Sequence, residues 1–261
     1  MKGRKRKEKE HYNRQSSKAL ESIPKDRWNS GSTAVNSALS APYISCEQTL
    51  RQTCVNKALL DYGCGNGIFS IFPAKNGSQV IGVDISEGQI KLAMERAVYE
   101  GVSESASFFV GDCEALGFED DCFDVILSSG TLSCLDLEKA FCEMARLLKP
   151  DGCVVIVDTL GHNPLLNLNR KIKLRRGLRT QWTVDHILHM NDLKLAESYF
   201  GRVEVKFFDL ATLAIAPFCN CDNSYTCSLV RLLNKIRRYV IQNANLTEVC
   251  IQGCNYTFST E

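Results

Sequence analysis

Residues 57–158 alternate between short apolar runs and segments with helical spacing, and this alternation constrains the fold more than any other feature. The apolar runs are typical of buried strands, and strands that alternate with helices form a parallel sheet with right-handed crossovers. We therefore predict an α/β fold with a doubly wound, Rossmann-like sheet and helices on both faces. The predicted strands lie within 57–63, 79–85, 106–112, 123–129 and 153–159, and the clearest helices lie at 86–101 and 137–148, with a turn at 149–152.

Three alternate glycines, Gly63, Gly65 and Gly67, follow the first predicted strand. In a doubly wound sheet, ligands bind beyond the carboxyl ends of the strands, where the strand order reverses. Glycine permits a positive φ and lets the backbone approach a ligand closely. A nicotinamide-binding loop would need a third glycine at the position of Ile68, and no Gly-Lys-Ser or Gly-Lys-Thr phosphate loop is present. Pro73, soon after the glycines, predicts that the first helix starts late, kinks or stays short.

The pattern Asp-x-Gly-x-Gly-x-Gly, which begins at Asp61, resembles the first motif of the class I S-adenosylmethionine-dependent methyltransferases. The resemblance runs from about residue 55 to 160 and is greatest to small-molecule methyltransferases of the type 11 group. It implies S-adenosyl-L-methionine as the cofactor and methyl transfer to a small organic acceptor as the reaction. The cofactor-binding residues that it implies are Asp61, Gly63, Gly65, Gly67, Asp84, Ile85, Asp112, Cys113 and Ser128.

The resemblance also implies roles for the acids that end the second and third strands. Asp84 would accept hydrogen bonds from both ribose hydroxyls, and a carboxylate suits a diol because it offers two acceptor oxygens. Asp112 would accept the adenine amino group, next to the backbone amide of Cys113. Enzymes of this class end in an antiparallel hairpin, which residues 202–210 and 248–259 could form as the last of seven strands, and a helix is predicted at 228–244.

The segment after the fifth strand, residues 160–200, is predicted to form a helical or loop lid over the acceptor. It contains His162 and His186, which we predict as catalytic bases because histidine titrates near neutral pH. It also carries a basic cluster that could hold a carboxylate, a phosphate or a nucleic-acid backbone, or could be a solvated helical face. The cluster comprises Arg170, Lys171, Lys173, Arg175, Arg176 and Arg179.

Other features bear on the substrate and the alternatives. The segment "SSGTLSCL" after the fourth strand lacks the Asn-Pro-Pro-Tyr type motif of adenine methyltransferases and the Pro-Cys pair of pyrimidine carbon-5 enzymes, and Cys134 in it is predicted to pack. Nucleic acid is therefore disfavoured as a partner. The alternatives are an RNA or other nucleic-acid methyltransferase that uses a basic arm and the lid, and a catalytically silent scaffold that binds cofactor.

Residues 1–40 are polar and charged, and we predict a mobile basic arm with one short helix near 14–23, followed by a single domain over 41–261. Across the chain 31 Lys and Arg balance 30 Asp and Glu, and no window resembles a membrane span or a secretory signal, so we expect a cytoplasmic protein. Thirteen cysteines fit packing in a reducing compartment, and five near the end lack zinc-knuckle spacing, so no metal is expected. The sequence does not indicate an oligomeric state.

Overall fold

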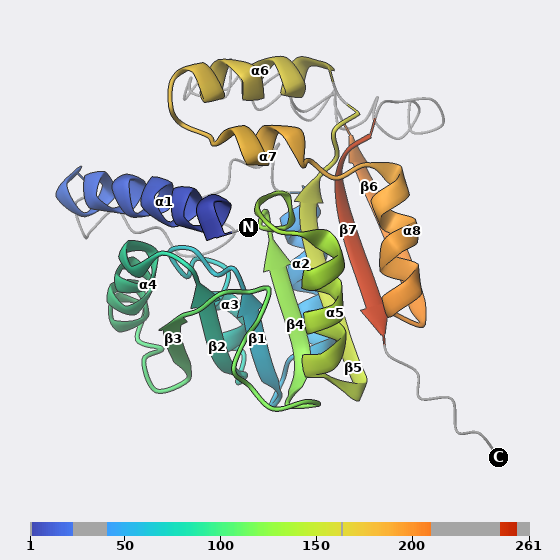
Figure 1. Ribbon diagram of the computed structural model, residues 1–261. Coiled ribbons are helices and arrows are strands. Elements are labelled where there is room, and N and C mark those ends of the chain that lie inside the picture. Colours follow the sequence, from blue (N-terminus) through green and yellow to red (C-terminus); the bar gives the residue numbers. More distant parts are fainter. Residues whose placement is uncertain (1, 23–40, 163, 210–245, 255–261) are drawn as a thin grey trace, which may run out of the picture.

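The computed structural model describes residues 2–22, 41–162, 164–209 and 246–254. Its centre is a seven-stranded sheet in the order β3-β2-β1-β4-β5-β7-β6, and Figure 1 shows this sheet edge to edge. The first five strands in this order are mutually parallel, and β7 is antiparallel to both β5 and β6. The strands are β1 (Ala58–Tyr62), β2 (Gln79–Asp84), β3 (Ala106–Val110), β4 (Phe123–Ser129), β5 (Leu148–Thr159), β6 (Arg202–Asp209) and β7 (Leu246–Cys254). The predicted doubly wound sheet and its antiparallel C-terminal pair are confirmed.

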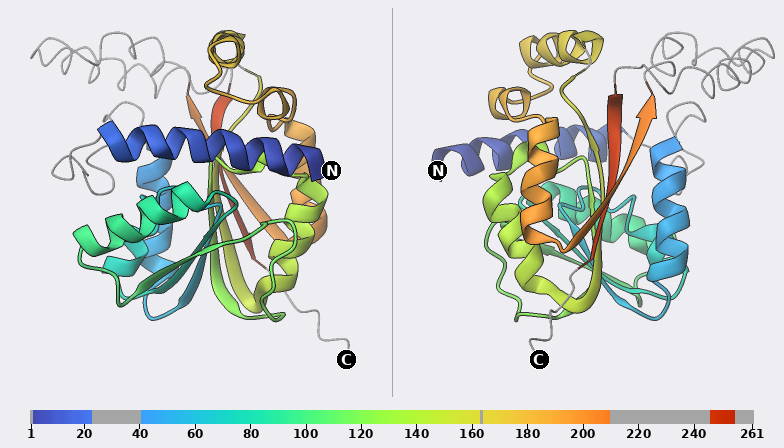
Figure 2. Two further views of the ribbon diagram at one scale, coloured as in Figure 1. Left: turned by 60° about the vertical axis from the view of Figure 1, so that its left-hand side comes forward. Right: turned by 90° about the vertical axis from the view of Figure 1, so that its right-hand side faces the viewer.

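Helices cover both faces of the sheet and separate two apolar cores. One face carries α2 (Ala41–Thr53), α3 (Ile71–Lys75) and α4 (Glu87–Tyr99), and the other carries α5 (Leu137–Leu147) and α8 (Met190–Tyr199), as Figure 2 shows. Side chains alternate across a strand, so successive residues of β1 pack into different cores. Leu59 belongs to the core under α2, α3 and α4, and Leu60 belongs to the core under α5 and α8. The strands therefore read as continuous apolar runs, as buried parallel strands do.

The two clearest predicted helices are confirmed, and each begins at a side-chain cap. The hydroxyl of Ser86 accepts the backbone N–H of Gln89 at the start of α4, and the carboxylate of Asp136 accepts that of Lys139 at the start of α5. Pro73 lies inside α3, which has only five residues, as predicted. These local signals fix where the helices lie against the strand ends.

The predicted turn at residues 149–152 is different in the structure, because these residues belong to the first part of β5. The strand pairs Leu148 with Phe123 and then Cys153 with Val125, so the register shifts between the two pairs. Proline and glycine here form an irregularity within a strand rather than a separate turn. The helix predicted at 228–244 lies outside the described residues, as do the side chains of the five C-terminal cysteines.

The N-terminal segment is also different from its prediction over the residues that the structure describes. Lys2–Ser22 form one continuous helix, α1, instead of a short helix near 14–23. This helix packs on α4 and crosses above the carboxyl ends of the strands (Figure 2). Its position makes it a cover for that end of the sheet.

The segment after β5 rises above the sheet as α6 (Pro164–Arg175) and α7 (Gln181–Asp185) (Figure 1). A parallel bridge between Leu160 and Leu188 joins the two ends of this excursion, and the N–H of Gly161 donates to the Leu188 carbonyl at 2.7 Å. The helix α8, which lies within the predicted lid range, instead packs against α5 through Leu193 and Ala196 in the apolar core. The part above the strand ends is therefore the shorter segment between Gly161 and Leu188.

Candidate functional site

A cavity of about 300 Å³ opens at the carboxyl ends of β1 to β4, where the strand order reverses. Its floor comes from the loops that follow these strands, and its roof comes from α1. Doubly wound sheets bind ligands at this place. The floor residues used below are Gly63, Gly65, Asp84, Ile85, Asp112, Cys113, Glu114, Gly130 and Thr131, and the roof residues are Arg4, Lys5, Glu8 and Tyr12.

The glycine loop folds tightly over the end of β1. The N–H groups of Gly63 and Cys64 both donate to the Val83 carbonyl at 2.9 Å. A Cβ on Gly63 would overlap the side chain of Thr131, and one on Gly67 would lie 2.9 Å from the Cβ of Ala93. These two glycines make room for the protein itself, and Gly67 does not line the cavity.

Gly65 is the glycine that leaves space for a ligand. It lines the cavity with φ +52°, and the nearest atom to a built Cβ is the Gln89 side-chain oxygen at 3.9 Å. Its N–H donates to the carboxylate of Asp84 at 3.0 Å, so the backbone here is held by the strand end next to it. The expectation that the glycines admit a ligand therefore applies to Gly65 in particular.

Asp61 lies beneath the loop and does not line the cavity. Its carboxylate is buried and accepts the Ser70 hydroxyl at 2.5 Å. Burial raises the pKa of Asp61 to about 7, the Ser70 hydrogen bond opposes this, and the charge of Asp84 adds to it. The structure thus places this predicted cofactor residue as a support for the loop.

Asp84 ends β2 and lines the cavity, next to Ile85. One carboxylate oxygen accepts the N–H of Gly65 and the other accepts the N–H of Ser86 at 2.9 Å. Burial raises its pKa, and these two backbone hydrogen bonds oppose the rise. The two amides fix the orientation of the carboxylate, and each oxygen keeps a lone pair for a ligand donor.

The loop after β3 brings three predicted or new residues to the cavity. Asp112 is partly exposed there, and one of its oxygens accepts the N–H of Glu114 at 3.1 Å. Burial raises the pKa of the Cys113 thiol well above its usual range, so the thiol stays protonated near neutral pH. Glu114 was not foreseen; its buried carboxylate accepts the N–H of Asp136 at 2.9 Å.

The roof is tied to this acidic loop by charge. The ammonium group of Lys5 contacts the carboxylates of Asp112 and Glu114, and the guanidinium of Arg4 pairs with Glu114. Burial raises the pKa of Glu114, but the hydrogen bonds from Asp136, Arg4 and Lys5 outweigh this and lower it. These contacts join residues more than a hundred positions apart.

Further contacts hold α1 to both the body and the lid. The side-chain oxygen of Asn13 accepts the Ser86 hydroxyl at 2.7 Å and the N–H of Gly88 at 3.0 Å. The guanidinium carbon of Arg4 lies 4.6 Å from the ring centroid of Trp182 in α7, a cation–π contact. One face of α1 lines the cavity, because helical spacing brings four of its residues together: Arg4, Lys5, Glu8 and Tyr12. This spacing is the signal for a polar helical face that sequence reasoning missed.

Tyr12 and Cys134 meet inside the cavity, with the phenolic oxygen 3.3 Å from the sulfur. Burial raises the pKa of both groups, that of Cys134 to about 12. Near neutral pH both therefore carry their protons, and Cys134 is not a thiolate nucleophile. Glu8, one turn from Tyr12, is also buried, which raises its pKa; Thr180 and Arg4 partly offset the rise.

Ser128, a predicted cofactor residue, is fully buried in β4 and does not line the cavity. The next three residues, Ser129, Gly130 and Thr131, do line it. The hydroxyl of Thr131 donates to the Gly63 carbonyl at 3.1 Å, which joins the β4 loop to the glycine loop. Side chains alternate along a strand, so Ser129 reaches the cavity where Ser128 does not, and the role of Ser128 in cofactor binding stays a prediction.

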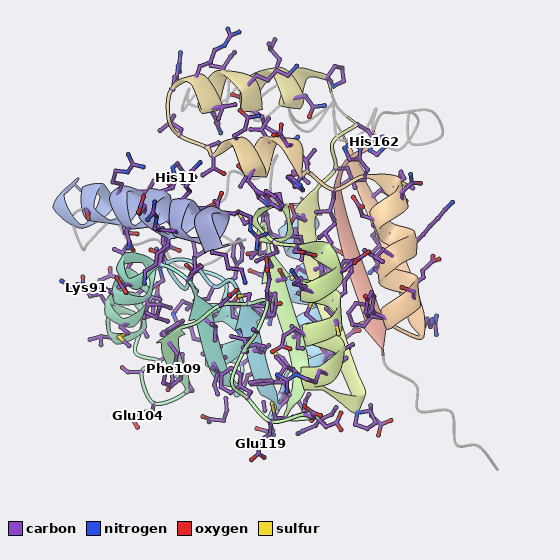
Figure 3. All side chains as sticks on the ribbon, viewed as in Figure 1. His11, Lys91, Glu104, Phe109, Glu119 and His162 are labelled. Carbon is purple, nitrogen blue, oxygen red and sulfur yellow. The ribbon has the colours of Figure 1, made fainter. Side chains whose placement is uncertain are left out.

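The predicted catalytic histidines do not line the cavity. His162 is exposed at the base of the lid, with its ring 5.2 Å from that of His189, and Figure 3 shows it between β5 and α6. The ring of His186 is exposed and stacks on Trp182 at a centroid distance of 3.4 Å. Their role as bases stays a prediction that this arrangement does not test.

Residues 60–156 match the family model described as "Methyltransferase domain". A demethylmenaquinone methyltransferase of Bacteroides fragilis is 39% identical over 103 residues, which cover 38% of this chain and 42% of that protein. The chain spans about two fifths of the length of this relative, and between a quarter and just over half of the length of several others.

Solved structures show the same fold at low identity. The phosphoethanolamine N-methyltransferase 2 of Haemonchus contortus, in complex with phosphomonomethylethanolamine and S-adenosylhomocysteine, matches with a TM-score of 0.59 and 20% identity, over 82% of this chain and 53% of that one. The geranyl diphosphate C-methyltransferase of Streptomyces coelicolor matches with a TM-score of 0.59 and 15% identity, over 83% and 80%. Among the residues that the structure describes, no helix combines the length and the apolar character needed to cross a bilayer.

Proposed function

We propose that this chain, whose residues 60–156 match a methyltransferase domain model, is a class I S-adenosylmethionine-dependent methyltransferase that transfers a methyl group to a small organic acceptor. The observation that carries the proposal is the cavity at the strand ends, where Gly65, Asp84 and Asp112 meet. The matched relatives and structures act on small molecules such as demethylmenaquinone and geranyl diphosphate, which supports this class of acceptor.

The residues at the cavity fit the cofactor. Asp84 would accept the two ribose hydroxyls, because its carboxylate already stands fixed by two amides and faces the cavity. Asp112 and the amide of Cys113 would receive the adenine edge, and the open side of Gly65 would face the amino-acid portion. Asp61 and Gly67, which do not line the cavity, would support the loop from behind, while Gly63 lines the cavity and Ile85 would pack on the nucleoside.

When bound, S-adenosylmethionine would supply an electrophilic methyl carbon: an acceptor lone pair would form a bond to this carbon while the carbon–sulfur bond breaks and its electron pair leaves on sulfur. The protein mainly has to orient the acceptor and exclude water, and orientation alone can lower such a barrier by several kcal/mol. The helix α1 covers the cavity and suits this purpose. Of the acceptor lid predicted over residues 160–200, the segment between Gly161 and Leu188 lies above the strand ends and would cover the acceptor.

An acceptor with an acidic hydrogen also needs a place for its proton. Glu8 is the candidate inside the cavity, because burial raises its pKa and neither oxygen has a hydrogen bond of normal geometry to a described residue. His162 and His186 remain the candidates from the sequence, and either would act only if the lid brought it to the cavity.

We propose a location in the cytoplasm for the protein.

Titration calorimetry with S-adenosylhomocysteine tests the cofactor site. We expect binding by the wild type and a loss of about 1.5–3 kcal/mol in Asp84→Ala, the range for a hydrogen bond to a charged group. Asp124→Ala is a matched control, because that acid lies at the opposite end of β4 and binds Lys149. A folded wild type that gives no heat with this ligand would rule the proposal out.

The nucleic-acid alternative receives less support from the structure than from the sequence. Three cations of the N-terminal segment, Arg4, Lys5 and Lys9, pair with acids of the body. Salt-dependent retention of RNA that is lost on deletion of residues 1–10 would favour this alternative. Incubation of the protein with labelled methyl donor and cell extract distinguishes the three cases. Small labelled products indicate a small-molecule methyltransferase, labelled RNA indicates a nucleic-acid methyltransferase, and the absence of any labelled product indicates a silent scaffold.

A further inference from the structure

A second cavity of about 290 Å³ adjoins the first beneath the lid. It lies between α1, the loop after β4, and the end of α6 with the linker to α7. The lining residues that matter here are Tyr12, Gln15, Gly130, Ser133, Lys173 and Arg179. No assigned cofactor residue lines it.

The two cavities meet at Tyr12 and Gly130, which line both. Tyr12 stands at this boundary with its hydroxyl 3.3 Å from the sulfur of Cys134. A molecule in the second cavity can therefore present one end to the first cavity at this point. This is the arrangement that transfer between two bound molecules requires.

The second cavity is basic. Lys173 and Arg179 line it, and no acidic side chain does so among the described residues. Within the same ranges neither cation forms an ion pair. The buried guanidinium of Arg170, one turn before Lys173, donates to the Asn167 side chain at 2.9 Å and adds a third positive charge nearby.

One buried acid, Asp158, interacts with Arg170 and Arg179 by charge but does not line the cavity. Asp158 is buried under this region, and its two oxygens accept the N–H groups of Leu132 and Thr159 at 3.0 and 2.7 Å. Burial and the charge of Arg179 together lower the pKa of Arg170 to about 10, although Asp158 opposes both. The cations therefore repel one another, and a bound anion would relieve this repulsion.

We propose that the second cavity is the acceptor subsite and that the acceptor carries a carboxylate or phosphate group, which binds Lys173 and Arg179. The methyl-accepting atom of the same molecule then lies toward Tyr12, at the boundary with the first cavity. Ser133 and Gln15 offer neutral hydrogen-bonding groups to the part between. This inference rests on the proposed function, whose cofactor site it adjoins.

Phosphorus NMR of inorganic phosphate, titrated with the full chain, tests the subsite without knowledge of the acceptor. We expect millimolar binding by the wild type and a loss of roughly tenfold or more in the double variant Lys173→Met, Arg179→Met. The control is the double variant Lys171→Met, Arg175→Met. These two cations lie on α6, the helix of Lys173, and are exposed, but they do not line the cavity. The control should bind phosphate within about twofold of the wild type.

Acetate in a parallel carbon-13 experiment distinguishes a carboxylate from a phosphate. Preferred binding of either anion supports the proposal and names the group. Equal losses in the two double variants would show diffuse attraction to a basic helix and would overturn the subsite, as would absence of binding by the wild type. The titration with S-adenosylhomocysteine, which neither double variant should change, separates these results from failure of the cofactor site.

Discussion

The floor and the roof of the cavity are built in different ways. The floor consists of strand ends and tight loops with carboxylates held by hydrogen bonds: Asp84 accepts two backbone amides, and the buried Asp61 accepts the Ser70 hydroxyl. The roof is the N-terminal helix α1, which charged side chains such as Arg4 and Lys5 join to the floor. The floor depends on backbone conformation, which few residue types can adopt, whereas the roof depends on charged pairs, of which Lys5–Asp112 is partly exposed and therefore weakened by solvent and salt.

This difference predicts that substitutions in the floor will have large effects on folding, and that substitutions in the roof will have small effects on binding. The strongest test is Gly63→Ala. The residue has φ +78° and no room for a Cβ beside Thr131, so strain and overpacking should together lower the free energy of unfolding by about 3–5 kcal/mol.

Gly101→Ala is the matched control for this variant, because its φ is +69° and a Cβ there meets nothing within 4 Å. It should cost only about 1–2 kcal/mol, the strain of the left-handed conformation alone. Urea unfolding measures both values. Equal losses would show that the close approach to Thr131 does not contribute, and would weaken the contrast between floor and roof.

The second test uses pH and Asp61. Its pKa is about 7 in the folded protein against 3.8 as the ordinary value, so the folded state retains a proton that the unfolded state releases between these values. Its contribution to stability is therefore lost as the pH rises toward 7, by about 2–3 kcal/mol between pH 5 and 7. Asp61→Asn cannot ionise and should flatten this part of the stability curve.

Glu114, which meets the roof, should behave in the opposite sense. Its pKa is lowered in the folded protein, so its contribution is present above the ordinary value of 4.5 and is lost as the pH falls further. Unfolding curves of the wild type, Asp61→Asn and Glu114→Gln across pH 4–8 separate the two groups. A wild type whose stability is flat between pH 5 and 7 would contradict the neutral buried state of Asp61.

The smallest expected effect concerns Lys5, which pairs with the carboxylate of Asp112 that a ligand amino group would use. Lys5→Met should release this carboxylate and tighten binding of S-adenosylhomocysteine by about 0.3–1 kcal/mol, because the pair is partly exposed. Lys9→Met is the control. Lys9 lies on α1, as Lys5 does, but it pairs with Glu87 of α4 and does not line the cavity. Weaker binding by the first variant would mean that Lys5 itself contacts the ligand.

The sequence indicated the two acids of the floor that end strands, because this part of the floor is local, but it did not indicate Glu114 or Thr131. The acids Asp84 and Asp112 each follow an apolar run, and parallel strands bring such ends to one edge of the sheet. Ser128 shows the limit of this reasoning. Its burial and the exposure of Ser129 to the cavity depend on the register of β4, which an unalternated apolar run does not reveal.

The roof was not predictable in the same way. The residues of α1 are polar and highly charged, and a helix of this kind has no apolar stripe to indicate a partner. Its position depends on contacts of Arg4 and Lys5 with residues more than a hundred positions away. The lid range likewise included α8, because only tertiary packing shows that Leu193 and Ala196 belong to the core beside α5.

The bridge between Leu160 and Leu188 has a consequence for how this protein can change. A segment that leaves and rejoins the body at one point can be exchanged for another of different length at little cost in chain entropy. The strands below would keep their register, because no pairing within the sheet depends on the exchanged residues. This single module could then be replaced while the first cavity underneath, which none of its residues lines, keeps its form.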